Sequence, residues 1–374
     1  MKILIDGRMY GLEHAGIGRY VEQLVKNLTI LDTKNDYVIL LRKRYFDILK
    51  FPKNWKKVLA NISHYSFLEQ IQLPIIIYKE RADLVHFPHF NIPILYFGKF
   101  VVTIHDLIKH TSKGKETTTR DPWLYWFKYL GYKLVFNQAI KRASKIIVPS
   151  EFVKEDLVKT YGLLKDKVVV TYEGVEDKLK ETRQNAKILE KYGIKNPFVI
   201  YTGSLYPHKN VERLVEAVVH LNNIYHLSIS LVVVCARNVF YERFKQKIRE
   251  MKAENFVNLV GFVPDEDLAV LYNEAEAFVF PTLSEGFGLP GLEAMSSGCP
   301  VICSDIPVLR EIYNDAAVYF DPLNVKEIAG RIKELMAFGS EEKKKLANKG
   351  FKQAKKYSWE KMAKETISVY ESLN

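Results

Sequence analysis

Cysteine is scarce in this chain of 374 residues, which has only Cys235, Cys299 and Cys303. Each lies in an apolar run, and none has a His or a second Cys pair nearby. This pattern favours buried free thiols and argues against a disulfide framework or a zinc site. Long apolar runs are also missing: no window reaches the roughly 18 apolar residues of a membrane-spanning helix.

Several motifs that would identify other protein classes are absent. Gly16 and Gly18 precede a helical pattern, but their spacing is not G-x-G-x-x-G, which argues against a dinucleotide oxidoreductase. No RNP, KH or helix-turn-helix pattern occurs, which argues against nucleic-acid binding. No D-x-D triplet that would hold a divalent ion stands at an expected strand end, so a metal-independent site is predicted.

Positive charge, in contrast, is in excess. Lys and Arg number 55 against 44 Asp and Glu, a formal net charge of +11. This excess favours an anionic partner such as a phosphorylated ligand, a membrane face or nucleic acid, and composition alone does not choose among them. The first residues, MKILIDGRMY, have a short apolar run followed at once by Asp6 and Arg8, which is not typical of a signal peptide. We therefore expect a cytoplasmic protein.

Short apolar runs rich in β-branched residues recur along the first half, each followed by a helical pattern. They are too short for helices and predict buried parallel strands with helices on both faces of the sheet. These runs are residues 2–5, 37–41, 83–87, 100–106, 145–150 and 167–174.

The same pattern restarts after the polar stretch 177–196, which we interpret as the domain boundary. We therefore expect an α/β protein of two Rossmann-like, doubly wound domains, residues 1–178 and 179–356. A final amphipathic helix, 357–374, should pack on another element. The strands expected in the second domain are 197–203, 229–235, 257–261, 277–281, 300–304 and 317–320.

The stretch SEGFGLPGLEAM, 284–295, follows an expected strand and joins a glycine-rich loop to a helix. Gly286 and Gly288 would let the loop's backbone amides approach a ligand, and the start of the helix favours a phosphate. Glu293 then falls on the first helical turn, where it would accept hydrogen bonds from a ribose diol. Glu285 would suit the hydroxyls of a second sugar. The alternative is a capping loop with two solvated acids.

Two further candidate positions follow expected strands. In GSLYPHKN, Lys209 stands next to a helix start and would neutralise a diphosphate, helped by His208 if that ring is protonated. In TIHDL, His105 and Asp106 end a strand on the side where ligands bind open α/β sheets. A single His is more often structural, but the pair at a strand end favours a function.

These residues resemble a known family. The pattern from Glu285 to Glu293, the GSLYPHKN loop, VGFVPDEDLAVLYNEAEAFVFP and the N-terminal AGIGRY are similar to family 4 retaining glycosyltransferases of the two-domain GT-B fold. The resemblance covers nearly the whole chain, and its most specific part is the stretch between the two glutamates. The segments SDIPVLREIYNDAAVYFDP, HFPHFNIP and VVTIHDL resemble the mannosyltransferase-like branch that builds bacterial surface polysaccharides.

The resemblance implies roles for individual residues. Glu293 would hold the ribose of a sugar nucleotide, and Glu285 the transferred sugar. Lys209 would bind the diphosphate, and His105 would contact the sugar near its reacting carbon. The residues implied to complete the donor site are Gly16 and Gly18 near the diphosphate or acceptor, Val260 and Phe262 beside the base, and the loop Gly286, Phe287, Gly288 and Leu289.

One position departs from the family. Ser204 stands where many members have an Arg that pairs with the lysine on the diphosphate. Ser204 still offers a hydrogen bond, and Arg8 or Arg19 is a candidate replacement cation. The resemblance further implies retention of configuration, GDP-mannose as donor, and a terminal helix that returns to the first domain. A sugar-nucleotide epimerase, a phosphorylase or an inactive sugar-nucleotide-binding protein remain alternatives.

Two basic, aromatic stretches, 41–59 and 121–145, lie in the first domain. In the second stretch, lysines stand among apolar residues at helical spacing: Trp123, Trp126, Phe127, Leu130, Leu134 and Ile140. This pattern is typical of an interfacial helix on an anionic membrane, and equally of a helix that packs on a core. Both hold if one end is buried and the aromatic end meets lipid. A glycan or lipid-linked acceptor is then expected.

Overall fold

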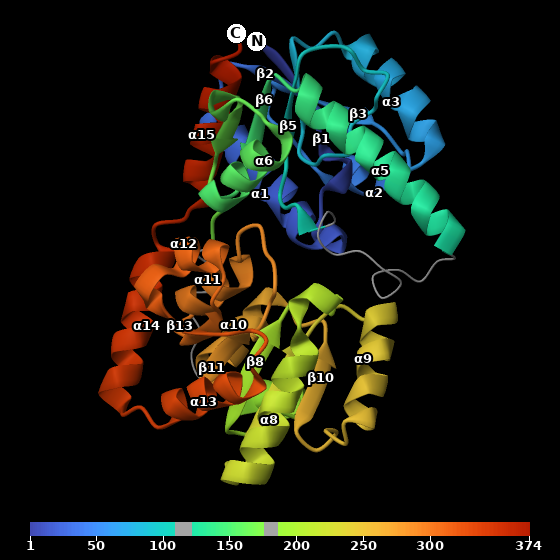
Figure 1. The fold of residues 1–374 in the computed structure, drawn as a ribbon. Helices are drawn as coiled ribbons and strands as arrows, with labels where there is room; N and C mark the ends of the chain where they lie inside the picture. The colour runs from blue at the N-terminus through green and yellow to red at the C-terminus, as the bar shows by residue number, and fades with distance from the viewer. Residues whose placement is uncertain (109–121, 176–185) are drawn as a thin grey trace. The chain divides into compact units, whose positions relative to one another are not determined.

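A computed structural model describes residues 1–108, 122–175 and 186–374. The chain divides into two compact units, each built around its own parallel sheet (Figure 1). Of the described residues, unit 1 contains 1–108, 122–174 and 358–374, and unit 2 contains 175 and 186–357. The boundary predicted between residues 178 and 179 lies outside the described residues.

Unit 1 has a seven-stranded sheet in the order β3-β2-β1-β4-β5-β6-β7, and all neighbouring strands are parallel. The strands are β1 Lys2–Asp6, β2 Asp36–Leu41, β3 Trp55–Leu59, β4 Leu84–Phe87, β5 Phe100–Thr103, β6 Lys145–Val148 and β7 Val168–Val170. The helices are α1 Ala15–Leu31, α2 Lys43–Ile48, α3 Phe67–Glu80, α5 Pro122–Arg142, α6 Glu151–Tyr161 and α15 Trp359–Glu371.

Unit 2 has a six-stranded sheet in the order β10-β9-β8-β11-β12-β13, again parallel throughout. The strands are β8 Phe198–Thr202, β9 Ser230–Val234, β10 Val257–Gly261, β11 Ala277–Phe280, β12 Val301–Ser304 and β13 Ala317–Phe320. The helices are α7 Ala186–Lys191, α8 Val211–Tyr225, α9 Val239–Glu250, α10 Asp265–Glu274, α11 Leu289–Ser296, α12 Pro307–Tyr313, α13 Val325–Met336 and α14 Ser340–Ala354.

The doubly wound α/β prediction is confirmed, because every predicted strand is present and buried residues fill both sheets. One strand was missed. β3 lies inside the stretch 41–59, and Lys56 and Lys57 interrupt its apolar pattern. It forms the edge of its sheet, where lysines are common because they discourage pairing with another chain.

The terminal helix α15 belongs to unit 1 and packs against α1. Its Tyr370 is fully buried, and the hydroxyl lies 2.6 Å from Nδ1 of His86 on β4. At the start of the helix, the backbone of Ser358 and Trp359 lies so close to Gly174 that a Cβ there would come within 2.1 Å of the Trp359 nitrogen. These contacts fasten the last residues of the chain to its first sheet.

In each sheet the chain runs outward on one side of a central strand and then returns to the other side. This reversal falls between β1 and β4 in unit 1, and between β8 and β11 in unit 2. Ligands of open α/β sheets bind beyond the carboxyl ends of the strands at such a switch point. The loops after these four strands are therefore the places to look for a site.

Candidate functional site

The unit 2 switch point brings together Lys209, from the loop after β8, and Glu285, from the loop after β11. Lys209 Nζ lies 2.5 Å from Glu285 Oε1, and the two side chains are only 15% and 10% exposed. The aromatic ring of Phe280 lies 5.6 Å from the same ammonium group. A largely buried charge needs a partner of opposite charge. Here Lys209 and Glu285 are each other's partner. The sequence prediction that they share one site is consistent with this contact.

Asn210 fixes the loops that carry this pair. Its buried side-chain amide donates to the carbonyl oxygens of Pro281 at 2.9 Å and Pro322 at 2.8 Å. Its φ is +58°, a left-handed conformation that Asn tolerates better than most residues. The Leu283 N–H adds a bond of 2.8 Å to the His208 carbonyl. Sequence reasoning missed Asn210, although its position beside Lys209 before a helix was the signal available.

The glycines of the loop before α11 have a packing role that the sequence did not reveal. Tyr313, buried on α12, donates its hydroxyl to the Gly288 carbonyl at 2.5 Å. A Cβ would lie 2.6 Å from this hydroxyl oxygen at Gly288 and 2.2 Å from it at Gly291. Gly288 also has a φ of +103°. These glycines are therefore needed to pack Tyr313 under the loop, apart from any ligand.

The loop turns into α11 at Leu289, with Pro290 in the first turn as predicted. Glu293 is the fifth residue of this helix, so its predicted place on the first turn is wrong by one position. Its side chain is half-buried. The side chain of Phe287 turns inward and packs on Tyr357, with ring centroids 5.5 Å apart. What Phe287 can offer a ligand is thus its backbone amide.

The remaining predicted donor residues of unit 2 follow β8 and β10. Ser204 is half-buried, and its carbonyl accepts a hydrogen bond from Tyr201 at 2.7 Å. Val260 is half-buried in β10, whereas the Phe262 side chain is 67% exposed. Burial, and then the charge of Lys209, lower the pKa of His208 to about 4. A protonated His208 that helps to hold a diphosphate is therefore not supported near neutral pH.

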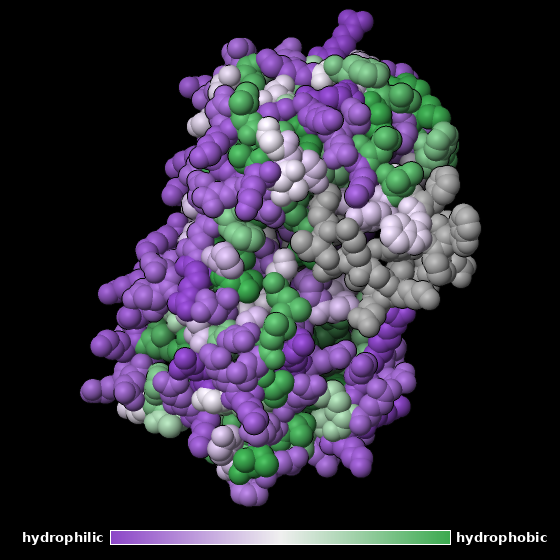
Figure 2. All heavy atoms as spheres, viewed as in Figure 1, coloured by the Kyte–Doolittle hydropathy of each residue, from purple (hydrophilic) through white to green (hydrophobic). Residues whose placement is uncertain are grey.

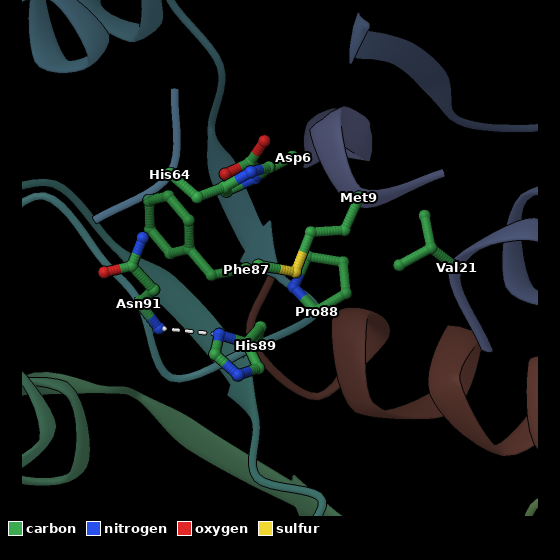
Figure 3. A pocket seen from close by; sticks show the side chains of 8 residues that line it. All are labelled: Asp6, Met9, Val21, His64, Phe87, Pro88, His89 and Asn91. Carbon is green, nitrogen blue, oxygen red and sulfur yellow. Dashed lines mark hydrogen bonds between the residues drawn. The ribbon is translucent and has the colours of Figure 1, made fainter. Parts of the chain in front are cut away.

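In unit 1 the switch point holds a small pocket. Figure 3 shows side chains from the ends of β1 and β4 and from the segments after them around it, together with His64 from the segment after β3 and Val21 from α1. The His89 ring accepts a hydrogen bond of 3.3 Å from the Asn91 backbone N–H, which shapes the loop after β4. The residues that line the pocket are Asp6, Met9, Val21, His64, Phe87, Pro88, His89 and Asn91.

A buried ion cluster supports this pocket. The fully buried guanidinium of Arg8 donates to Asp6 through Nε at 2.8 Å and through Nη2 at 2.7 Å. The same Nη2 lies 2.7 Å from Glu69, which also accepts two bonds of 2.9 Å from Asn91. Arg8 is thus paired inside its own unit, and this arrangement does not favour the expectation that it replaces the missing family arginine. Burial alone would raise the pKa of Asp6, but the charge and the hydrogen bonds of Arg8, with a smaller contribution from His64, together outweigh it and lower that pKa.

The two N-terminal glycines lie inside α1, not ahead of it as predicted, because this helix begins at Ala15. A Cβ on Gly18 would come within 1.8 Å of the Gly11 carbonyl oxygen, so Gly18 is required by the close approach of the preceding loop. Gly16 is exposed and has open space around it. Of the two glycines, Gly16 is the one with room for a ligand.

His105 follows β5 in unit 1, and its side chain is 13% exposed. Nδ1 lies 3.2 Å from Glu173 Oε1, and Nε2 lies 3.0 Å from the Pro88 carbonyl oxygen. Burial alone would lower the pKa of His105, but the hydrogen bond and the charge of Glu173 outweigh it and raise that pKa. Glu173 was missed in the sequence, although it closes the run VVVTYEG after a strand.

Comparison with known proteins agrees with this geometry. Residues 182–353 match the family model described as Glycosyl transferases group 1, and residues 15–179 match the model described as Glycosyltransferase Family 4. The O-antigen chain mannosyltransferase B of Escherichia coli is 28% identical over 394 aligned residues that cover 100% of both chains.

Solved structures show the same fold. Sucrose-phosphate synthase from Thermosynechococcus elongatus matches with a TM-score of 0.77 at 20% identity, over 100% of this chain and 98% of that one. HepE of Anabaena, solved in complex with UDP-glucose, matches with a TM-score of 0.76 at 17% identity, over 100% of both chains. The predicted GT-B fold class is thereby confirmed.

Removing the buried cation of unit 1 should strongly destabilise the protein. In Arg8→Met, the buried carboxylates of Asp6 and Glu69 lose their cation, and we expect the free energy of unfolding at pH 7 to fall by about 3–5 kcal/mol. The pKa of Asp6 is lower in the folded protein than in the unfolded chain. The ionised Asp6 therefore stabilises the fold fully above the pKa of the unfolded chain, and this stabilisation is lost as the pH falls through the lower pKa of the folded protein. The deficit of the variant should therefore shrink in acid.

Chemical denaturation of wild type, Arg8→Met and Arg44→Met at pH 7 and pH 4 measures this effect. Arg44 is the matched control, since its side chain is 73% exposed and its ion pair with Glu13 is loose at 3.8 Å. Its loss should change the unfolding free energy by about 0.5 kcal/mol or less. Equal stabilities of the two variants at pH 7 would contradict the role given to Arg8.

Proposed function

Since this chain belongs to the glycosyltransferases, with a Family 4 part followed by a group 1 part, we propose that it moves mannose from GDP-mannose to a glycan or lipid-linked acceptor in polysaccharide synthesis. We further propose retention of configuration and no metal requirement. The observation that carries the proposal is the ion pair of Lys209 and Glu285 at the unit 2 switch point.

The charges of this pair suit the two ends of a sugar nucleotide. Glycosyl transfer develops positive charge on the sugar ring and negative charge on the departing diphosphate. Lys209 would stabilise the diphosphate, and Glu285, only 2.5 Å away, would accept hydrogen bonds from hydroxyls of the transferred sugar. The amides of the loop from Gly286 to Leu289, at the start of α11, would bind the remaining phosphate oxygens.

The outer part of the nucleotide would meet two further residues. Glu293, half-buried on α11, would accept hydrogen bonds from the ribose hydroxyls. The exposed ring of Phe262 follows a sharp bend at Gly261, whose φ is +81°, and would stack on the base. The O-antigen mannosyltransferase relative supports the choice of mannose as the transferred sugar. Lys209 and the helix start supply charge stabilisation without a metal, which supports metal independence.

The acceptor would bind unit 1 on the surface around the switch point. The pocket itself has room for about one water molecule, so a sugar would contact its rim and would not enter it. Asp6 and His89 are the polar groups of this pocket that stand nearest to the ends of β1 and β4.

Replacing either charge of the donor pair should abolish transfer. We expect Lys209→Met and Glu285→Gln each to lower kcat for release of GDP from GDP-mannose by roughly 100-fold or more, since each removes a charge aimed at the transition state. The double variant leaves no unpaired buried charge, so it should stay folded and inactive.

A second ion pair of unit 2 serves as the control. Lys343 and Glu276 lie 2.7 Å apart, and each is 30% exposed. Lys343→Met and Glu276→Gln should retain wild-type rates of GDP release. Mass and linkage analysis of the product then shows which sugar is transferred and to which position. Full activity in either Lys209→Met or Glu285→Gln would refute the donor assignment.

A lipid-linked acceptor calls for a membrane-facing surface, and unit 1 has a candidate. α3 exposes an apolar stripe on successive turns: Phe67, Leu68, Ile71, Ile75 and Tyr78. On α5 the predicted apolar stripe is exposed at Trp126, Leu130 and Leu134, while Ile140 is buried. The side chains of Trp123 and Phe127 lie outside the described residues. Among the described side chains of α5, those near Ile140 are thus buried and those from Trp126 to Leu134 include exposed apolar groups, which agrees with the case in which both alternatives hold.

The loop 92–98 contacts both α3 and the last residue of α5. The Tyr78 hydroxyl on α3 accepts a bond of 2.8 Å from the Phe97 N–H, and Arg142 on α5 donates to the Ile94 carbonyl at 2.8 Å. Phe97 is itself 74% exposed. Figure 2 shows apolar side chains gathered on this side of unit 1, over α3. We call this surface, formed by the exposed residues of α3, loop 92–98 and α5, the apolar face.

Lysines around the apolar face favour an anionic bilayer as its partner. Lys79 on α3 and Lys133 and Lys141 on α5 are all exposed. An apolar helix face flanked by lysines is typical of proteins that lie in the membrane interface. In the part of the chain that the structure describes, no helix is long and apolar enough to cross a bilayer. We propose peripheral binding through the apolar face.

Charges introduced on α3 should release the protein from vesicles. In Ile71→Glu/Ile75→Glu, two exposed apolar side chains are replaced by carboxylates, and we expect flotation with phosphatidylglycerol-containing vesicles to fall by roughly tenfold or more. Ile30→Glu, a change at a 69% exposed position of α1, should float like wild type. Equal flotation of all three proteins, or no flotation of wild type at low salt, would contradict the proposal.

A further inference from the structure

The hydrogen-bond partners of His105 determine its protonation state. Its Nδ1 faces the Glu173 carboxylate at 3.2 Å, and its Nε2 faces the Pro88 carbonyl oxygen at 3.0 Å. A carbonyl oxygen only accepts hydrogen bonds, and an ionised carboxylate also only accepts. A neutral imidazole has one N–H and would leave one of these contacts as two acceptors facing each other. With an ionised Glu173, both contacts are satisfied only by an imidazolium, in which both nitrogens donate.

His86, one strand away on β4, shows the opposite arrangement. Its Nδ1 lies 2.6 Å from the Tyr370 hydroxyl, and its Nε2 lies 2.8 Å from the Thr103 hydroxyl. A hydroxyl group both donates and accepts, so a neutral ring satisfies both contacts. Burial, and then the charge of His105, lower the pKa of His86 to about 3. Two neighbouring histidines are therefore held in different charge states by the chemistry of their partners.

The other groups around His105 agree with a cation at this place. The ring of Tyr20 on α1 stands edge-on to it, with centroids 4.7 Å apart. Asp106, the next residue along the chain, adds a second negative charge. The neutral His86 also interacts with it. Glu173 itself is buried, and within unit 1 it has its counter-charge in the His105 ring.

We propose that Glu173 is a positioning residue that holds His105 as a doubly protonated imidazolium, so that His105 serves glycosyl transfer as an N–H donor and not as a base. A ring in this state donates to a sugar hydroxyl or to a phosphate oxygen once Nε2 leaves the Pro88 carbonyl. The use of His105 in transfer rests on the proposed function. The charge state that Glu173 imposes on His105 does not depend on the proposed function, and it is measured separately.

NMR of the full-length protein with isotope-labelled histidine measures the charge state directly. His105→Asn identifies the signals of His105 among the nine histidines. In wild type we expect both ring nitrogens to remain protonated above pH 6.5, the ordinary midpoint of the side chain. Glu173→Gln should move the midpoint to lower pH, whereas Glu155→Gln, the same change at an exposed position of α6, should not.

Two outcomes of this experiment would overturn the proposal. One is a wild-type His105 that titrates at or below pH 6.5. The other is an unchanged midpoint in Glu173→Gln. If Glu173→Gln does not fold, Glu173→Asp takes its place, since it keeps the charge but shortens the side chain. It should keep a raised midpoint while the hydrogen bond to Nδ1 weakens, and a midpoint at or below the ordinary one would count against the proposal.

The rate profile tests the use of this charge in transfer. Because the fraction of imidazolium falls about tenfold for each pH unit above the midpoint, Glu173→Gln should lose kcat by roughly tenfold or more at pH 8 and recover towards wild type at pH 6. A purely structural role would lower the rate equally at both pH values, and this result would refute the catalytic part. If the NMR shift occurs while wild type releases no GDP from GDP-mannose, the donor assignment fails and the Glu173–His105 arrangement stands.

Discussion

The ion pair of Lys209 and Glu285 is the interaction on which the proposed donor site depends. Two opposite charges from separate loops meet 2.5 Å apart at the reversal point of the unit 2 sheet, largely out of water. Taking both charges out of water is unfavourable, and their attraction offsets this cost only when their geometry is well defined, so the two loops must be held in place. Asn210, through its bonds to Pro281 and Pro322, and Tyr313, through its bond to Gly288, fix them. A ligand with a negative diphosphate and a hydroxylated sugar then satisfies both charges at once.

Unit 1 uses charge differently at its own reversal point. Arg8 is buried and paired with Asp6 and Glu69, and Asn91 in turn bonds Glu69. Lys209 keeps 15% of its side chain exposed. The difference in exposure separates a cation that holds loops together from one that is available to a substrate. His105 is an intermediate case, since it is 13% exposed and bonded on both sides to groups of its own unit.

The fold was predictable from the sequence because parallel strands buried on both faces give short β-branched runs, and these recur along both halves of the chain. β3 was not predicted because Lys56 and Lys57 interrupt its apolar pattern, as lysines often do in edge strands. The proposed site was predictable in part. Lys209 and Glu285 stand in loops whose glycines and helix starts are visible locally, and their contact agrees with the shared site predicted for them. Asn210, Tyr313 and Glu173 were missed because their roles depend on partners 71, 25 and 68 residues away, which no local pattern records.

The central claim is that the Lys209 and Glu285 pair receives a sugar nucleotide without a metal. Isothermal titration calorimetry of the wild-type protein with GDP-mannose, in excess EDTA and again with Mg²⁺, tests it most directly, with the GDP-free buffer as blank and UDP-, ADP- and dTDP-sugars as competitors. We predict saturable binding of GDP-mannose with the same Kd in EDTA and in Mg²⁺. Binding that appears only with Mg²⁺, or no binding of any sugar nucleotide, would contradict the account.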